Sequence, residues 1–527
     1  MKFSRPIIML VICLFLVCAC SPETPQPGVL VLENVRIIDA ESGQATQRQS
    51  VLIENGIIVD IAAEPRSDWP AAARPPVEDL YLTPALYDAH VHIFDERDLQ
   101  MYALYGIQMV RNMDGWPWHL WLRDSAVNEA DPRAGMITSG SQMQAPEIAD
   151  GQDAIEQIES ERAAGYDWVK LYDALPASAL YALADQGELK ITGHLPASVP
   201  LPEVLASGVF DDIAHAEELA HALDGPYAEG AAGLDALAAD MIENKTALTT
   251  TIVNNLMIAE QVADIEANLA REATASAPPL LQVFWASSFN PWRSQRDSNS
   301  AAAYRRQVDS LMKLVAGLHR RGVILLAGTD APNPTTVPGE SLHQELAILV
   351  DAGLTPAEAL KSATVAPADH FAPGARGGRI EIGSPAQAIL SRGNPLENIG
   401  ALKDFNGLVI NGNWYPRAIV DSKRQALRNA YAHDLEVMQY LAPDSPTAIF
   451  EAEEASDSGT PISPEGLTSL VWFYMKIGNP EAAGAVAEKL LELHPSVESK
   501  QVSDYIRTLR DLPETDHEDH QNSNRDR

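Results

Sequence analysis

The amino-acid sequence predicts an α/β protein built on a (β/α)8 barrel of the TIM type. Three observations lead to this prediction. Strand-like and helix-like runs alternate from residue 84 to residue 375, as parallel βαβ units do. Runs of β type at 30–83 and 376–422 flank that segment, and they predict one composite β-sandwich domain drawn from both flanks. From 423 to 511 the apolar periodicity is helical, which predicts a C-terminal helical extension.

The N-terminal segment has the pattern of an export signal. Two basic residues precede an apolar run at 7–17, which is too short and too early for a membrane-spanning helix. The run ends in the sequence VCAC, which resembles a bacterial lipobox that is cleaved before Cys20 and lipidated there. Residues 1–20 are therefore predicted to be a lipoprotein signal peptide, and residues 21–29 a proline-rich tether. An ordinary secretory signal is the alternative.

Serine rather than aspartate follows Cys20, which points to the outer membrane, with the folded domains in the periplasm. All three cysteines, Cys13, Cys18 and Cys20, lie in this leader. A lipidated mature chain has no free thiol, so an intrachain disulfide, a thiolate zinc site and a cysteine nucleophile are excluded. Any metal must then be bound by His, Asp, Glu or a modified Lys. The net charge of −35 argues against nucleic acid or an anionic membrane surface as a partner.

Hairpin turns mark the two flanking β segments. Asn55-Gly56 and Asn411-Gly412 each interrupt or end a strand-like run, and Asn-Gly favours a type I′ turn. The simplest arrangement joins both flanks in one domain. The predicted strands are Val29–Asp39, Ser50–Asp60, Gly378–Gly383, Ala386–Leu390 and Gly407–Gly412.

The segment between the flanks contains eight strand candidates, with helix-like segments between them. Eight βαβ units of this kind form a closed parallel barrel. The segment Ala263–Tyr304 is longer than a barrel helix needs, and we expect it to cover the face where the strands end. The predicted strands are Asp88–Ile93, Gln108–Asn112, Met136–Ser139, Trp168–Tyr172, Lys190–Leu195, Asp212–Ala216, Ala247–Val253 and Val323–Asp330. The predicted helices include Ala154–Ala164, Ser178–Leu183, Leu201–Ser207 and Leu234–Asn244.

The extension contains a predicted helical hairpin, Leu467–Ile477 and Ala482–Leu493, around a Gly478-Asn479-Pro480 break. This hairpin resembles one tetratricopeptide unit, which would recruit a protein partner. A single repeat does not build a solenoid, since about three are needed, and a helical cap packed on the barrel is the alternative. Residues 512–527 are polar and charged, and are predicted to be disordered.

Side chains of metal-ligand type lie on the predicted barrel strands. Two histidines two residues apart on a strand point to the same face, although an isolated H-x-H has little specificity. A strand histidine is usually a satisfied core residue, but a lysine within an apolar parallel strand is costly to bury unless it is paired or modified. The joint pattern predicts a metal site at the carboxyl ends of the strands. Its residues are His90, His92, Lys170, His194, His215 and Asp330.

These residues and their flanking motifs resemble those of the amidohydrolase superfamily, in its imidazolonepropionase-like and Xaa-Pro or Xaa-Arg dipeptidase-like branch. The resemblance covers about residues 30 to 420. The chain departs from the family pattern at Ala85 and Tyr87 before the H-x-H, and at Gln387, where the family has Asp. Tyr87 bears on metal affinity and Gln387 on the stability of the β domain. The motifs are Val35–Asp39, Ser50–Gly56, Thr83–His92, Gly106–Gly115, Leu326–Ala331, Leu342–Glu345 and Ala359–Thr364.

The resemblance implies a two-metal centre. His90, His92 and Asp330 would hold the more buried ion, and His194 and His215 the second. A carbamate formed on Lys170 by CO2 would bridge the two ions, because it is an anionic ligand with two oxygens whereas a bare ammonium repels a cation. Asp330 would accept a proton from the shared water and pass it to the leaving group. The ligand types suit two zinc ions, with Mn, Fe, Co and Ni as alternatives.

The function expected from this resemblance is hydrolysis of an amide or peptide-type C–N bond in a small-molecule or peptide-like substrate. Tyr172 and His343 are candidate substrate-binding residues, with a barrel filler and a helix-capping role as their respective alternatives. Two other functions stay open. The same centre permits hydrolysis of a lactone or phosphoester, and a lipoprotein scaffold with a partner-recruiting helical region would need no catalysis.

Overall fold

The computed structural model describes residues 28–125, 132–184, 189–220, 230–288, 290–295, 298–333, 335–441, 445–454 and 461–510. The predicted signal peptide with Cys20, the tether up to residue 27 and the predicted disordered tail lie outside these residues. Of the helices within the described ranges, none combines the length and the apolar character that a membrane crossing requires.

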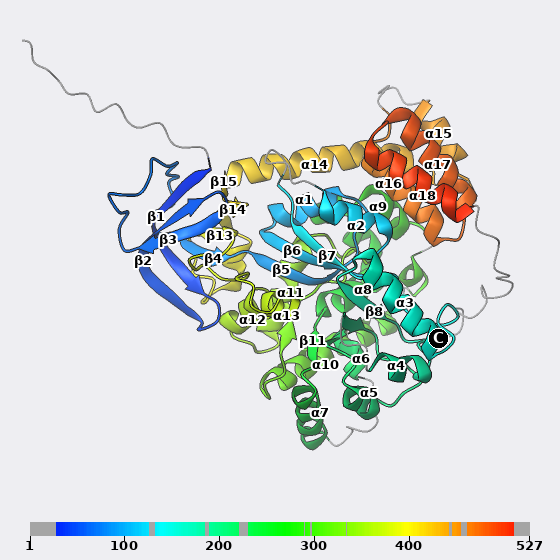
Figure 1. Cartoon of the computed structure of the whole chain (residues 1–527), viewed down its shortest axis with the longest axis horizontal. Helices are drawn as coiled ribbons and strands as arrows, with labels where there is room; N and C mark the ends of the chain where they lie inside the picture. The colour runs from blue at the N-terminus through cyan, green and yellow to red at the C-terminus, as the bar shows by residue number, and fades with distance from the viewer. Residues whose placement is uncertain are drawn as a thin grey trace, which may run out of the picture.

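One end of the molecule is a seven-stranded sheet, built from strands before and after the barrel segment (Figure 1). Its N-terminal strand β1 pairs antiparallel with β2 and parallel with β4, and β4 pairs antiparallel with the C-terminal strand β13. In sheet order its strands are β15 (Asn413–Pro416), β14 (Phe405–Ile410), β13 (Ala388–Ser391), β4 (Tyr81–Pro84), β1 (Val29–Asp39), β2 (Gln44–Glu54) and β3 (Ile57–Ala62).

The two flanks pair through β4 in one continuous sheet, and side chains of β1, β2, β13 and β14 share one core. The backbone of Ile58 in β3 also bonds to Gly383 and Ser384, before β13. One predicted strand needs correction. Gly378–Gly383 is not a strand, because Gly378 (φ 68°) and Gly383 (φ 91°) bend the backbone away from extended geometry. Both predicted hairpin turns are confirmed: the Asn and Gly of each turn have positive φ, as a type I′ turn requires.

The barrel segment contains parallel strands at all eight predicted positions. β5, β6 and β7 form one sheet and β8 to β12 another. Isolated parallel bridges connect Ser139 with Trp168 and Val91 with Ala331, so both edges of the smaller sheet meet the larger one. The strands are β5 (Leu86–Val91), β6 (Ile107–Asn112), β7 (Gly135–Thr138), β8 (Trp168–Leu171), β9 (Lys190–Gly193), β10 (Asp212–Ala214), β11 (Ala247–Thr249) and β12 (Leu325–Leu326).

Helices alternate with these strands and pack around them (Figure 1). The four helices named from the sequence correspond to α3, α4, α5 and α7. The long segment before β12 folds into α8, α9 and α10. The helices are α1 (Arg97–Leu104), α2 (Pro117–Asp124), α3 (Gly151–Ala164), α4 (Ala177–Leu183), α5 (Leu201–Ser207), α6 (Ala216–Ala220), α7 (Ala231–Glu243), α8 (Ile252–Leu269), α9 (Pro279–Ala286), α10 (Ser298–His319), α11 (Glu340–Asp351), α12 (Pro356–Ser362) and α13 (Val365–Phe371), with the 3-10 turns η2 (Glu272–Ser276), η3 (Pro291–Ser294) and η4 (Ile399–Leu402).

The helical extension is tied to the barrel. Its first helix runs from the sheet past α1 to the remaining helices of the extension, which gather at the opposite end of the view (Figure 1). The predicted hairpin is present as α16 and α17. Ser469 of α16 donates to the carbonyl oxygen of Phe94, in the loop after β5, at 2.7 Å. The extension consists of α14 (Arg417–Met438), α15 (Thr447–Glu454), α16 (Pro464–Lys476), α17 (Pro480–Leu493) and α18 (Val497–Arg510).

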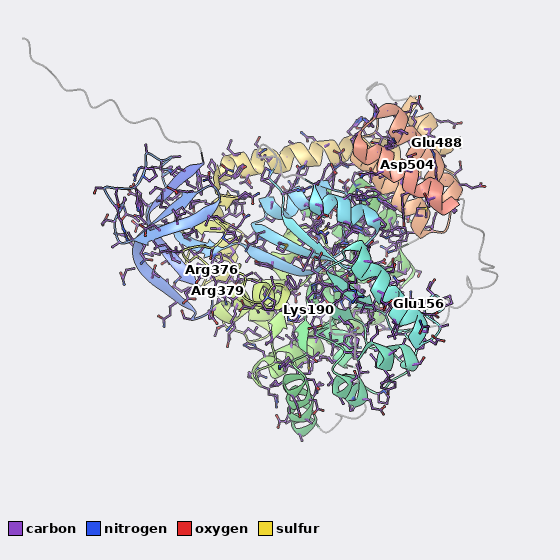
Figure 2. The ribbon with its side chains drawn as sticks, viewed as in Figure 1. Glu156, Lys190, Arg376, Arg379, Glu488 and Asp504 are labelled. Atoms are coloured by element: carbon purple, nitrogen blue, oxygen red, sulfur yellow. The ribbon has the colours of Figure 1, made fainter. Side chains whose placement is uncertain are left out.

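The sheet and the barrel are joined by polar contacts as well as by the chain. Arg379, labelled in Figure 2, pairs with Asp369 of α13 at 2.7 Å and with Glu41 after β1 at 3.2 Å. Gln387, which stands where the family has Asp, accepts from the backbone N–H of Asn411 at 3.0 Å. It therefore holds the β14–β15 turn, which is a structural contact within the sheet.

Candidate metal centre and active site

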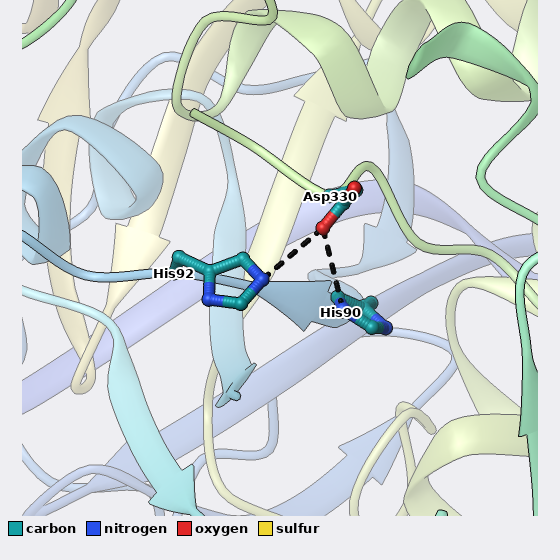
Figure 3. Close-up of side chains that lie close together, drawn as sticks. All are labelled: His90, His92 and Asp330. Atoms are coloured by element: carbon teal, nitrogen blue, oxygen red, sulfur yellow. Dashed lines mark ion pairs between the residues drawn. The ribbon is translucent and has the colours of Figure 1, made fainter. Parts of the chain in front are cut away.

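His90 and His92 lie at the carboxyl end of β5, and their side chains converge on Asp330 (Figure 3). The ring centroids of the two histidines are 5.5 Å apart. The His90 side chain is completely buried, whereas a quarter of the His92 side chain is exposed. The period of two along the strand places both rings on the inner face, as the sequence predicted.

Asp330 follows β12 with a positive φ of 57°, which turns its side chain toward the histidines. One carboxylate oxygen, Oδ1, lies 3.3 Å from His90 Nε2 and 3.2 Å from His92 Nε2 (Figure 3). The other, Oδ2, accepts from the amides of Asn254 at 2.9 Å and Asn333 at 2.5 Å. The potential ligand atoms of Asp330 and the two histidines all lie within 4.8 Å of one another, close enough to hold a single ion.

The donor set fits a divalent cation. Among the described residues, neither ring nitrogen of His90 has a hydrogen-bond partner, and leaving such buried groups unsatisfied costs about 1–3 kcal/mol. Burial, together with nearby Lys170, lowers the pKa of His90 well below its usual value, so the imidazole is neutral and able to coordinate. Burial alone would raise the pKa of Asp330, but the neighbouring histidines hold it well below the usual range.

His194 and His215 follow β9 and β10 and complete a cluster of rings. His215 lies 4.5 Å from His90 and 4.7 Å from His194 between ring centroids. His194 Nδ1 donates to Glu218 at 2.8 Å, and His215 Nδ1 is hydrogen-bonded to the Thr251 hydroxyl at 2.9 Å. Metal-binding histidines are oriented by such bonds on the other ring nitrogen, which leaves Nε2 for an ion.

Lys170 lies within β8 and is 1% exposed. Burial lowers its pKa to about 8. It lines the same cavity as His92, His194, His215 and Asp330. The structure thus brings all six predicted ligand-type residues together. His90 contacts Asp330 and His215, and the other five residues line the cavity.

The two predicted substrate-binding residues have different positions. Tyr172 lines the cavity, and its ring lies 4.3 Å from that of His194 between centroids. His343 does not reach the cavity: it is buried on α11, where Nε2 is hydrogen-bonded to the carbonyl oxygen of Tyr105 at 2.8 Å. Burial lowers the pKa of His343 to about 4. The prediction that His343 contacts substrate is therefore wrong, because the ring is buried and its Nε2 is bonded to the backbone of Tyr105.

The cavity at the strand ends has a volume of about 520 Å³. Sequence analysis missed several polar residues that line it. Glu217 and the Asn254-Asn255 pair follow predicted strands directly, and that position was the signal for them. Asp114 follows β6 after one intervening residue. Lys476 belongs to α16 of the extension, and no local pattern connects it with the barrel.

A buried ion pair supports the strands beneath the cluster. Arg111 of β6 bonds both oxygens of Asp212 of β10, at 2.7 and 2.8 Å, and both side chains are fully buried. Asp212 also accepts from the hydroxyls of Thr192 and Thr249 at 2.8 Å. Burial would raise the pKa of Asp212, but Arg111 holds it well below the usual range. The network ties four strands at fixed spacing.

Comparisons with known proteins agree with this arrangement. Residues 213–415 match the model of the amidohydrolase family, a range that contains His215 and Asp330. No curated protein matches the sequence at a significant level. The structure is similar to that of a bottromycin amidohydrolase, with a TM-score of 0.62 and 22% identity, over 77% of this chain and 91% of that one.

Two further solved structures share the fold. A Xaa-Pro dipeptidase with bound methionine has a TM-score of 0.56 and 18% identity, over 74% of this chain and 100% of that one. The ochratoxinase of A. niger has a TM-score of 0.52 and 17% identity, over 74% of this chain and 95% of that one. The shared architecture is a barrel with a sheet domain, in agreement with the fold class expected from the sequence.

Proposed function

We propose that this chain, a member of the amidohydrolase superfamily, hydrolyses an amide or peptide-type C–N bond with the help of divalent metal ions. The observation that carries the proposal is the convergence of six ligand-type side chains from the parallel strands and their carboxyl ends, five of which line one cavity. The names of the similar structures, an amidohydrolase and a Xaa-Pro dipeptidase, support the same class of bond.

The finer proposal is a closed (β/α)8 barrel with two metal ions, which we expect to be zinc. The two bridges between the sheets support closure. His90, His92 and Asp330 would hold one ion, and His194 and His215 the other. Lys170 would bridge them as a carbamate, formed when its neutral amine adds to CO2 and releases one proton. A pKa of about 8 supports this step, because roughly a tenth of the amine is neutral at pH 7.

When bound, the ions would lower the pKa of a coordinated water to about 7 and polarise the scissile carbonyl. Asp330 would accept a proton from that water through Oδ1 and deliver it to the leaving nitrogen. Asn254 and Asn333 hold the other oxygen, so the carboxylate is aimed without help from substrate. Tyr172, which lines the cavity, would donate a hydrogen bond to a substrate carbonyl or carboxylate.

Tyr87, where the chain departs from the family pattern, does not displace the candidate metal ligands. Tyr87 is buried near Phe371, with ring centroids 6.2 Å apart, and burial raises its pKa to about 12. The phenol is therefore neutral and adds no charge beside His90 and His92. We expect Tyr87 to affect packing around β5 more than the affinity for metal.

A substrate screen with the metal-loaded protein tests the proposal. Dipeptides, N-acyl amino acids and cyclic amides are expected to be hydrolysed, with about two divalent ions bound per chain. A folded, metal-free protein that added ions do not activate would contradict the proposal. Lactones and phosphoesters belong in the same screen, and turnover of these alone would assign the centre to the other bond class.

We also propose that Cys20 is lipidated and anchors the chain in the outer membrane, with the barrel in the periplasm. The support is the leader sequence alone. Metabolic labelling with a palmitate analogue is expected to mark the wild-type protein and not Cys20→Ala. A label that persists in Cys20→Ala would contradict the anchor. The anchor would also be contradicted if equal shares of the wild-type and Cys20→Ala proteins were recovered in the membrane fraction.

A further inference from the structure

We infer that the C-terminal extension completes the active-site cavity, and that Lys476 binds a carboxylate group of the substrate. This inference rests on the proposed function, because it names the substrate class of the same site. The extension follows the sheet strands that close the family-like part of the chain, and the matched family segment ends at residue 415, before α14 begins.

Lys476 is the last residue of α16, and it lines the cavity together with Lys170, Asp330 and Asp114. Its ammonium nitrogen lies 2.7 Å from Asp114 Oδ2. About half of the lysine side chain is exposed, while the side chain of Asp114 is 12% exposed. Lys476 and His92 also line a smaller hollow beside this cavity. The ammonium group therefore faces the space next to the metal ligands.

The helix that carries Lys476 is fixed on the barrel by apolar and polar contacts. Trp472, one turn earlier, packs against Trp116 and Trp118 of the loop and helix after β6, at 5.1 and 6.2 Å between ring centroids. Deeper in the extension, the buried pair of Arg97 and Asp434 joins the start of α1 to α14 at 2.9 Å. These contacts determine where the end of α16 lies, so the packing of the extension on the barrel fixes the position of Lys476.

The contact with Asp114 positions the ammonium group of Lys476 but does not use all of its N–H donors. An ammonium group has three N–H donors, and Asp114 accepts one of them. Asp114 is itself held in the loop after β6, where its backbone N–H donates to the Ser139 hydroxyl at 3.1 Å. Burial would raise the pKa of Asp114, but Lys476 holds it below the usual range. Two donors remain for a ligand.

A carboxylate is the group that this wall of the cavity fits best. Among the described residues that line the cavity, the lysines and arginines are Lys170 and Lys476. Carboxylation of Lys170 would make it anionic, so Lys476 would be the remaining ammonium. Hydrogen bonds between an ammonium and a carboxylate are charge-assisted and stronger than neutral ones.

Other parts of the lining indicate what accompanies the carboxylate. Ile258 of α8, Trp292 of η3 and Tyr304 of α10 contribute apolar and aromatic surface. Trp292 and Tyr304 meet edge to face, with ring centroids 5.5 Å apart and planes at 87°. This combination fits an N-acyl aromatic amino acid, or a dipeptide whose free carboxylate reaches Lys476 while its amide lies over the metal ligands.

The test measures binding, so that it does not depend on turnover. The probe is 2-benzyl-4-oxopentanoate, which mimics N-acetyl-phenylalanine with CH2 in place of the scissile NH, and its partner is the primary amide of the same acid. Calorimetry with the metal-loaded full chain is expected to show the acid binding at least about 10-fold more tightly than the amide. In Lys476→Met this ratio is expected to fall to within about twofold of one, and Lys476→Arg is expected to keep most of it.

The control is Lys500→Met, on the exposed surface of α18, which is expected to keep the wild-type ratio. A wild-type ratio below about twofold would overturn the inference without any variant, even if Lys476→Met failed to fold. A ratio that persists in Lys476→Met would overturn it too, because the carboxylate would then be bound by the metal ions. If the ratio collapses in Lys476→Met but the wild type hydrolyses none of the amides screened, the carboxylate site stands and the proposed function fails.

Discussion

Replacing Asp330 by Asn tests the centre of the proposed chemistry with a change of very small volume. In the wild type, Oδ2 accepts two amide donors, from Asn254 and Asn333. These donors require an oxygen, so the new amide of residue 330 must place its oxygen there and its NH2 where Oδ1 was. That NH2 would face His90 and His92, where the wild type has an anionic oxygen. An amide nitrogen neither accepts the water proton nor binds a cation.

The expected loss can be stated from these contacts. A positioned general acid–base group contributes about 10²- to 10⁴-fold to the rate, which corresponds to about 3–5 kcal/mol in the activation free energy. The fold should be preserved, because both hydrogen bonds to Oδ2 can be kept. We therefore expect kcat to fall by at least about 100-fold, with a much smaller change in the free energy of unfolding.

The assay measures kcat and KM on the best amide substrate, in excess zinc, together with bound metal by elemental analysis. His90, His92 and the ligands of the second ion remain, so bound metal is expected to persist when zinc is in excess. The control is Asp351→Asn, at the exposed end of α11, which is expected to behave as the wild type. If Asp330→Asn kept its metal and its kcat stayed within about threefold of wild type, the assigned role of Asp330 would be refuted.

Three further outcomes are expected. Lys170→Ala should bind less metal than the wild type by elemental analysis, and equal metal content would count against a bridging carbamate. Arg111→Met removes the guanidinium partner of the buried Asp212 carboxylate, so the free energy of unfolding in urea should fall by about 3–5 kcal/mol; a loss below about 1 kcal/mol would contradict this. The pKa of His343 is about 4 when folded and about 6.5 when unfolded, so the unfolded chain takes up the proton first. Its stabilisation is complete above pH 6.5 and is lost as the pH falls toward 4, by about 2 kcal/mol at pH 5. His343→Gln should weaken the difference between urea melts at pH 7 and pH 5, and an unchanged difference would contradict the assignment.

Local patterns in the chain were sufficient for the positions of the barrel strands and for the grouping of the candidate ligands at their carboxyl ends. Strand positions follow from short apolar runs between helical ones, and all eight predicted positions contain strands. The carboxyl ends of parallel strands meet at one face, so residues such as His90, His194 and Asp330 had to approach one another once those strands formed. The Asn-Gly turns were equally predictable, because few residues other than Asn and Gly adopt two successive positive φ angles at low cost.

Long-range packing decided the rest. Whether the flanking strands form one sheet or two depends on the pairing of β1, β4 and β13, and the same alternating pattern suits either arrangement. The residues next to His343 in the sequence do not indicate that its side chain faces Tyr105 and not the cavity. Lys476 reaches Asp114 only because the tryptophan contacts dock α16 on the barrel. Such contacts join residues hundreds of positions apart, and their energies come from surfaces that exist only after each element has formed.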